Sequence, residues 1–177
     1  MAKTAQQPVL VIMGVSGSGK STIAGVLAGK LGWDLVEGDD LHPTANVAKM
    51  QSGLALTDED RWPWLALVSD QIRARTEVGI PGIMTCSALK KKYRDVLRGQ
   101  SVIFVFLQGS KDQISDRLAS RHGHFMPTSL LESQFTALEE PTDDENYIAL
   151  SISASPSEAA DEVIERLGLR SLGVSTS

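Results

Sequence analysis

The residues from Gly14 to Ser21 read Gly-Val-Ser-Gly-Ser-Gly-Lys-Ser, which matches the pattern G-x-x-x-x-G-K-[S/T] of a phosphate-binding loop. Glycines let the backbone turn its N–H groups inward around phosphate oxygens, and the helix that follows points its positive end at them. In such a loop Lys20 reaches the β- and γ-phosphates, and the Ser21 hydroxyl binds Mg²⁺. An apolar run at 9–13 and apolar residues at helical spacing in 21–31 supply the strand and the helix that the motif requires. We therefore expect a nucleoside triphosphate and Mg²⁺ to bind here, with triphosphate contacts from Gly14, Ser16, Gly17, Ser18, Gly19, Lys20, Ser21 and Thr22.

The composition is that of one globular domain. The chain has 177 residues, 42% of them hydrophobic and 22% charged, which is enough to bury a core. We predict a single domain over 1–170 and a disordered tail over 171–177, which is small and polar. The net charge of −5 argues against nucleic-acid or membrane-surface partners, and no apolar run approaches the roughly 20 residues of a membrane span. One cysteine, Cys86, excludes an internal disulfide, so we expect a cytoplasmic location.

Strand-like and helix-like segments alternate along the chain. Strands are predicted at 9–13, 33–37, 82–86, 101–107 and 148–153. Helices are predicted at 21–31, around 46–51, and at 58–76, 88–98, 111–121 and 129–138, with a last one that starts after Ser155. This alternation indicates an α/β fold in three layers, a five-stranded parallel sheet with helices on both faces. Ligands of such sheets bind at the carboxyl ends of the strands, which here carry the loop after Gly14, Asp39, Ser87 and the residues after Ser153.

The motifs that the chain lacks narrow the class. A regulatory GTPase would carry D-x-x-G and N-K-x-D sequences, and neither occurs. A mechanical ATPase would end an apolar strand in Asp-Glu, whereas the strand at 82–86 ends without an acidic residue. A small-molecule kinase is the class that remains.

Several segments outside the phosphate loop sharpen this interpretation. They are 37–43 (Glu-Gly-Asp-Asp-Leu-His-Pro), 49–53, 58–65, 86–94 (beginning Cys-Ser-Ala-Leu-Lys), 121–126 and 134–141. Together with the loop they resemble the gluconokinase family over residues 9 to about 167. The resemblance implies transfer of the ATP γ-phosphoryl group to the 6-hydroxyl of D-gluconate, a fold similar to shikimate and nucleoside monophosphate kinases, and a homodimer.

The acceptor side of this reaction needs a base and a cation. Asp39 follows the second predicted strand and is our candidate for the carboxylate that takes the hydroxyl proton, while Asp40 fits a helix cap or a solvated turn. A gluconate carboxylate needs fixed cationic donors, for which the candidates are His42, Arg61, Lys90 and Arg94. We favour Lys90 over Lys91 and Lys92, because three consecutive helical residues project about 100° apart. Ser87, at the end of a predicted strand, is a further candidate to hydrogen-bond the acceptor, and the resemblance adds His124 and Gln134 as acceptor contacts.

A mobile helical lid is predicted at about 117–134. Arg117 and Arg121 lie one helical turn apart on one face, and a Gly/His loop follows them. The resemblance implies that these arginines close over the ATP phosphates and exclude water, with Arg121 in a catalytic role. An exposed basic helix end is the alternative. His122 and His124 have no cysteine or third histidine beside them in the sequence, so we do not predict zinc.

Some alternatives stay open at this point. The acceptor could be shikimate, idonate or a nucleotide, and a nucleotide-binding module without turnover is the rival from another class. Glu37 stands where some relatives have Asp, which leaves open whether it supports Mg²⁺. We expect Trp62, Trp64 and Cys86 to serve packing, and residues 153–156 to lie near the adenine through backbone contacts.

Overall fold

The structure is a computed structural model that describes residues 7–120 and 128–171. Its strands are β1 (Val9–Met13), β2 (Leu35–Glu37), β3 (Gly82–Thr85), β4 (Val102–Gln108) and β5 (Tyr147–Ser151). Its helices are α1 (Lys20–Leu31), α2 (Thr44–Gln51), α3 (Asp58–Thr76), α4 (Lys91–Leu97), α5 (Lys111–Ser120), α6 (Thr128–Ala137) and α7 (Pro156–Leu167), with a short 3₁₀ turn η1 at Gly38–Leu41. The predicted tail 171–177, apart from Ser171, and part of the predicted lid, 121–127, lie outside the described residues.

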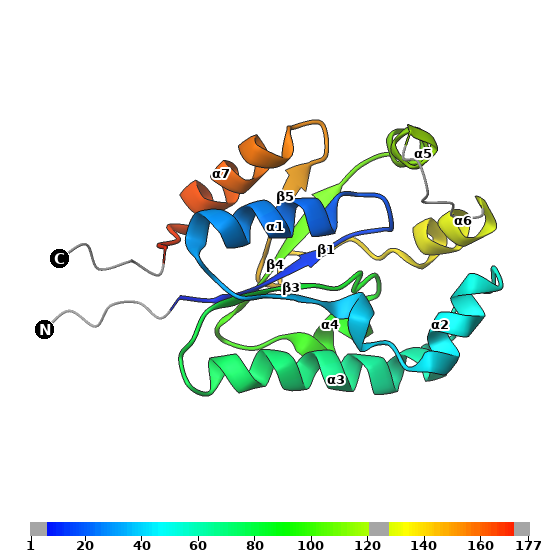
Figure 1. Cartoon of the computed structure of the whole chain (residues 1–177), viewed down its shortest axis with the longest axis horizontal. Coiled ribbons are helices and arrows are strands. Elements are labelled where there is room, and N and C mark those ends of the chain that lie inside the picture. Colours follow the sequence, from blue (N-terminus) through cyan, green and yellow to red (C-terminus); the bar gives the residue numbers. More distant parts are fainter. Residues whose placement is uncertain (1–6, 121–127, 172–177) are drawn as a thin grey trace, which may run out of the picture.

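Within these ranges the strands form one parallel sheet in the order β2-β3-β1-β4-β5, which confirms the predicted architecture. Val9 at the start of β1 lies opposite Gly82 of β3 and Val102 of β4, so the central strand has neighbours on both sides. Figure 1 shows α1 and α7 over one face of the sheet and α3 and α4 over the other. The helices α2, α5 and α6 gather at one end of the sheet (Figure 1).

The alternation of side chains along β1 divides the core in two. Leu10 and Ile12 pack in the cluster under α1 and α7, while Val9, Val11 and Met13 pack in the cluster against α3 and α4. All five residues of β1 are at most 1% exposed. A strand that is buried on both faces needs an apolar residue at every position, which is why this segment is continuously hydrophobic in the sequence.

The start of α3 is fixed by a capping box. The Thr57 hydroxyl accepts a hydrogen bond from the Asp60 N–H, and the Asp60 carboxylate accepts one from the Thr57 N–H. Two orphan donors of the first turn are satisfied in this way, and the acidic residues at 58–60 suit the positive end of the helix dipole. The predicted bounds of this helix, 58–76, are confirmed.

The prediction for α4 is wrong at its first three residues. The helix begins at Lys91, not at Ala88, because Ala88 adopts a left-handed φ of 45° and Lys90 is extended. Left-handed backbone in a residue other than glycine costs about 1–2 kcal/mol and cannot continue a right-handed helix. No described helix is long and apolar enough to cross a membrane.

Candidate active site

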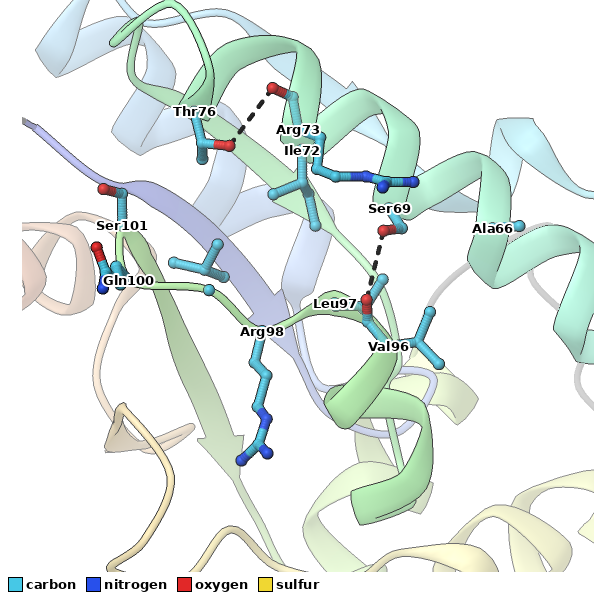
Figure 2. Close-up of a pocket in the computed structure, with 12 residues that line it drawn as sticks. Ala66, Ser69, Ile72, Arg73, Thr76, Val96, Leu97, Arg98, Gln100 and Ser101 are labelled. Carbon is cyan, nitrogen blue, oxygen red and sulfur yellow. Dashed lines mark hydrogen bonds between the residues drawn. The ribbon is translucent and has the colours of Figure 1, made fainter.

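Two of the cavities among the described residues lie at opposite ends of the sheet. The larger, about 720 Å³, opens between α3 and the segment after α4, at the start of β4 (Figure 2). Its lining includes Ser69, Arg73 and Arg98, and it contains none of the residues predicted for the site. The smaller, about 420 Å³, lies at the carboxyl ends of the strands. It brings together seven of the predicted residues: Ser16, Lys20, Asp39, His42, Arg61, Ser87 and Gln134. Because ligands of parallel sheets bind at this edge, the smaller cavity is the candidate active site.

The phosphate loop joins β1 to α1 through three glycines with positive φ. Gly14, Gly17 and Gly19 have φ values of 146°, 82° and 96°. A Cβ added at Gly14 would lie 2.9 Å from the Ser18 hydroxyl, and one added at Gly17 would lie 2.8 Å from the Leu118 side chain. The loop therefore depends on glycine for both its backbone conformation and its space. Helix α1 begins directly after it, so the positive end of the helix faces the loop.

Lys20 extends from the first turn of α1 back across the loop. Its Nζ donates hydrogen bonds to the carbonyl oxygens of Gly14 (2.9 Å) and Val15 (3.0 Å). Burial lowers the pKa of Lys20, and the nearby Asp39 carboxylate acts in the opposite direction. Because Lys20 belongs to the loop and also lines the cavity, its ammonium lies where a phosphate site and an acceptor site would meet.

Glu37 at the end of β2 is hydrogen bonded to the first turn of α1. The Ser21 hydroxyl donates to Glu37 Oε2 (3.0 Å), and the Thr85 hydroxyl donates to the same oxygen (2.5 Å). The Ser21 hydroxyl and the Glu37 carboxylate are oxygen ligands, the kind that Mg²⁺ prefers, and they lie directly beside the phosphate loop. The described residues contain no cluster of three or more His, Cys, Asp or Glu side chains, so a cation here would also need phosphate and water oxygens.

The turn η1 carries Asp39 to the cavity. Gly38 before it is buried, and a Cβ there would lie 2.1 Å from the Thr85 carbonyl oxygen, so only glycine fits. Trp64 Nε1 donates to the Gly38 carbonyl (2.7 Å) and holds the turn from the side of α3. The Asp39 side chain is 80% exposed and lines the cavity. Asp40 is not among the described residues that line it.

His42 follows this turn and is packed on Trp64. The two rings are stacked with centroids 4.0 Å apart, and the His42 side chain is 4% exposed. Trp64 is itself 2% exposed, which confirms its predicted packing role. Trp62 is 37% exposed and packs edge-on against the Tyr93 ring, with centroids 5.7 Å apart. Cys86 is buried, as predicted, and burial raises the pKa of its thiol to about 12.

Arg61 reaches the cavity from α3 and is held by Tyr93. Its Nη1 donates to the Tyr93 hydroxyl (3.1 Å), and its guanidinium carbon lies 5.4 Å from the centre of the Tyr93 ring. The Tyr93 hydroxyl in turn donates to the Asp58 carboxylate. Burial, together with this bond to Asp58, raises the pKa of Tyr93 to about 12. The phenol therefore stays protonated and links Arg61 to Asp58.

The structure corrects the prediction for Lys90. Its Nζ lies 3.2 Å from Asp58 Oδ1, and Lys90 is not among the described residues that line the cavity. Lys92 pairs with the same carboxylate. The bonds from Lys92 and Tyr93 hold the pKa of Asp58 well below its usual range. Asp58 thus engages two cations of this basic segment, and among the described residues Arg61 is the arginine that lines the cavity.

The prediction for Arg94 as an acceptor contact is also corrected. Its side chain is 1% exposed, and its Nε lies 2.6 Å from Glu145 Oε1. Its Nη1 donates to the carbonyl oxygens of Ala88 (2.9 Å) and Leu89 (3.1 Å). Arg94 therefore fixes the backbone that leads from β3 to α4. No local sequence signal could reveal this role, because Glu145 lies 51 residues further along the chain.

Arg94→Lys should lower the free energy of unfolding by about 1–3 kcal/mol, because lysine keeps the charge but cannot reproduce the bonds to Glu145 and two carbonyls at once. Urea unfolding followed by circular dichroism measures this loss. Arg98→Lys, at a side chain that is 58% exposed, is the matched control and should leave stability unchanged. Equal stability of the two variants would contradict the structural role of Arg94.

Gln134 of α6 binds the phosphate loop. Its Oε1 accepts a hydrogen bond from the Ser16 N–H (2.6 Å), and its Nε2 donates to the Ser16 hydroxyl (2.9 Å). Both residues line the cavity. The sequence predicts Gln134 only as an acceptor contact and carries no local signal for this bond to the loop, because the two residues are 118 positions apart.

Arg117 lies beside the other end of the loop. Its Nη2 donates to the Ile152 carbonyl, and a Cβ at Gly19 would lie 3.3 Å from its Nη1. A small hollow of about 50 Å³ there is also lined by Thr22, Ala154 and Pro156, close to the segment predicted to lie near adenine. Arg121, His122 and His124 lie outside the described residues.

The first strand of the parallel sheet leads through a glycine loop into a helix, and Asp39 and Arg61 line the same cavity as the loop residue Lys20. This arrangement defines a P-loop kinase of small molecules. A family profile described as "AAA domain" matches residues 9–141. The gluconokinase of Gluconobacter oxydans (strain 621H) is 51% identical over 157 residues, covering 88% of each chain. The chain belongs to the gluconokinase family.

Solved structures agree with this assignment. A gluconokinase from Sinorhizobium meliloti 1021 superposes with a TM-score of 0.85 and 40% identity, covering 93% of this chain and 94% of that one. Shikimate kinase from Aquifex aeolicus superposes with a TM-score of 0.58 at 15% identity, covering 90% and 95% of the two chains. At that identity the likeness shows the fold alone, which is the fold predicted from the sequence.

Proposed function

We propose that the protein transfers the γ-phosphoryl group of ATP to the 6-hydroxyl of D-gluconate, giving 6-phospho-D-gluconate and ADP. One observation carries the proposal: a single cavity is lined by Lys20 of the phosphate loop and by Asp39 and Arg61, so that phosphate and sugar-acid groups have adjoining sites. The choice of D-gluconate as the acceptor rests on the similarity to proteins named gluconokinase.

The donor side of the site holds the triphosphate. Phosphoryl transfer depends mainly on positioning and charge stabilisation, and there is little covalent chemistry for the protein to perform. The loop amides and Lys20 bind the phosphates, and Arg117 lies within reach of the same loop. Ser21, backed by Glu37, would hold Mg²⁺, which neutralises charge on the β- and γ-phosphate oxygens when bound. Arg121 remains our proposed catalytic lid residue.

The acceptor side positions the sugar acid. Asp39 accepts the proton of the 6-hydroxyl as the phosphoryl group arrives. Arg61 binds the gluconate carboxylate, since the other lysine or arginine among the described residues of the cavity is Lys20, which is assigned to phosphate. Ser87, His42 and Gln134 offer further polar contacts from the cavity wall, and His124 is proposed from the family resemblance.

A coupled assay of ADP release with Mg-ATP tests the function. The acceptors are D-gluconate, shikimate, idonate, AMP and none. We expect strong turnover with D-gluconate and a quiet blank. Turnover with another acceptor would retain the kinase chemistry and overturn the substrate, whereas ATP binding without turnover on any acceptor would favour a binding module.

Tyr93→Phe should raise KM for gluconate about 3–10-fold, because it removes the hydrogen bond that holds Arg61 and leaves the ring in place. The kcat and the KM for ATP should stay unchanged, since the substitution does not alter the phosphate loop or Lys20. Steady-state kinetics with each substrate varied in turn measure the difference. Tyr147→Phe, on β5 and outside the described lining of the cavity, is the control. An unchanged KM for gluconate in Tyr93→Phe would show that Arg61 does not depend on Tyr93.

The proposal includes a homodimer in the cytoplasm. The dimer rests on the resemblance to gluconokinases, and the location rests on a single, buried cysteine. Light scattering coupled to size exclusion measures the mass in solution against the 19.0 kDa of one chain. A mass of one chain over the working concentration range would exclude the dimer.

A further inference from the structure

His42 has a distinct neighbour at each of its two ring nitrogens. Its Nδ1 lies 3.3 Å from the side-chain nitrogen of Asn46, and its Nε2 lies 4.0 Å from Asp39 Oδ1. The ring cannot turn freely, because it is stacked on Trp64 and its side chain is only 4% exposed. The two sides of the imidazole therefore face different chemistry, one the protein interior and the other the cavity.

Asn46 determines the hydrogen bond at Nδ1. This residue of α2 is 5% exposed, and its Nδ2 lies 2.9 Å from the backbone carbonyl oxygen of Asp60. A carbonyl oxygen only accepts hydrogen bonds, so the Asn46 atom that faces it must be the amide nitrogen and not the amide oxygen. The same nitrogen carries a second hydrogen, which is available to His42. Nδ1 must then be the acceptor and can carry no proton in this arrangement.

We infer that Asn46 holds His42 as the neutral tautomer with its proton on Nε2, so that the ring presents an N–H donor to Asp39 and to the acceptor hydroxyl. The inference deepens the proposed function and rests on it for the identity of that hydroxyl. The charged groups that act on the ring are the Asp39 carboxylate and the Arg61 guanidinium. Burial lowers the pKa of His42; Asp39 opposes this effect and Arg61 adds to it, so the ring is neutral at neutral pH.

This tautomer separates the roles of the two residues. An imidazole that already carries its proton on Nε2 cannot take another from the acceptor at that atom while it stays neutral. The proton of the hydroxyl therefore goes to Asp39, and the Nε2–H of His42 orients either the carboxylate or the hydroxyl. Asn46 acts through His42 and does not touch the substrate, so it is a positioning residue.

Nitrogen-15 NMR of histidine-labelled protein tests the tautomer without reference to activity. The sequence has three histidines, and His42 is assigned as the resonance lost in His42→Gln. We expect a protonated Nε2 and an unprotonated Nδ1 throughout the neutral pH range. A proton on Nδ1, or a ring charged at neutral pH, would overturn the inference even if gluconate is the substrate. The result stands equally if the acceptor proves to be another compound.

Two substitutions at His42 test the function of the Nε2–H with whichever acceptor the protein uses. The amide nitrogen of glutamine can lie near the position of Nε2, whereas that of asparagine lies near the position of Nδ1. We expect His42→Gln to keep kcat within about tenfold of the parent and His42→Asn to lose about 10–100-fold, the cost of one hydrogen bond to a charged group. The opposite order would assign the function to Nδ1.

Asn46→Ala should lower kcat with KM for ATP unchanged, and should make His42 a mixture of tautomers in the NMR spectrum. A spectrum like that of the parent would exclude Asn46 as the residue that fixes the tautomer.

Discussion

Asp39→Asn is expected to lower kcat by roughly 10²–10⁴-fold while ATP binds with unchanged affinity, because an amide of the same shape cannot take the proton of the acceptor hydroxyl. The side chain is 80% exposed, so the substitution removes little packing and the fold should be retained. Rapid-quench measurement of product formation, together with calorimetric titration of ATP, separates the chemical step from nucleotide binding.

Asp40→Asn is the matched control for this variant. Asp40 is the next residue in the same 3₁₀ turn, carries the same charge and is outside the described lining of the cavity. We expect nearly normal kcat for Asp40→Asn, which would exclude a general effect of lost negative charge in the turn. Normal turnover by Asp39→Asn would remove Asp39 from the role of base, and loss of ATP binding would assign it to the nucleotide instead.

Lys20→Ala is expected to weaken ATP binding by about 10–100-fold, which corresponds to the loss of a hydrogen bond to a charged group, and to lower kcat by roughly 10²–10³-fold as well. The reason is the position of its ammonium, between the loop carbonyls of Gly14 and Val15 and the cavity that contains Asp39. There it can follow the negative charge that develops on the transferred phosphoryl group. Calorimetric titration of ATP and steady-state kinetics measure the two effects independently.

The control for Lys20→Ala is Lys30→Ala on the same helix. Lys30 pairs with Asp161 at the surface (2.6 Å), and its removal should change neither ATP affinity nor kcat. Unchanged ATP affinity in Lys20→Ala would undermine the assignment of the phosphate loop. Weakened binding with normal kcat would mean that Lys20 holds the ground state and the transition state equally.

The sequence predicted the elements of the fold well because the signals are local. The continuous apolarity of β1 and β4 follows from burial on both faces, and the acidic first turn of α3 follows from the helix dipole. The predicted start of α4 was wrong because the left-handed backbone of Ala88 has no sequence signal of its own. Its carbonyl accepts from Arg94, and that bond belongs to a network completed by the distant Glu145.

The candidate site was predictable in part for the same reason. Residues of the phosphate loop are contiguous, and Asp39 follows the end of a strand, so the topology of a parallel sheet places both at one edge. The choice among cations was not predictable. Lys90 and Arg94 lie in the same basic segment as Lys91 and Lys92. The sequence does not show which of these side chains is paired with a carboxylate and which faces the cavity.

The sequence by itself determined the phosphate loop, the parallel sheet and the edge at which its ligands bind, because each depends on neighbouring residues and on a fixed periodicity. The tertiary structure decided which side chains reach the cavity. Lys90 forms an ion pair with Asp58 and Arg94 forms one with Glu145, whereas Arg61 is hydrogen bonded to Tyr93 and lines the cavity. These pairings join residues 32 to 51 positions apart, and only the packing of α3, α4 and the segment before β5 brings their charges within hydrogen-bonding distance.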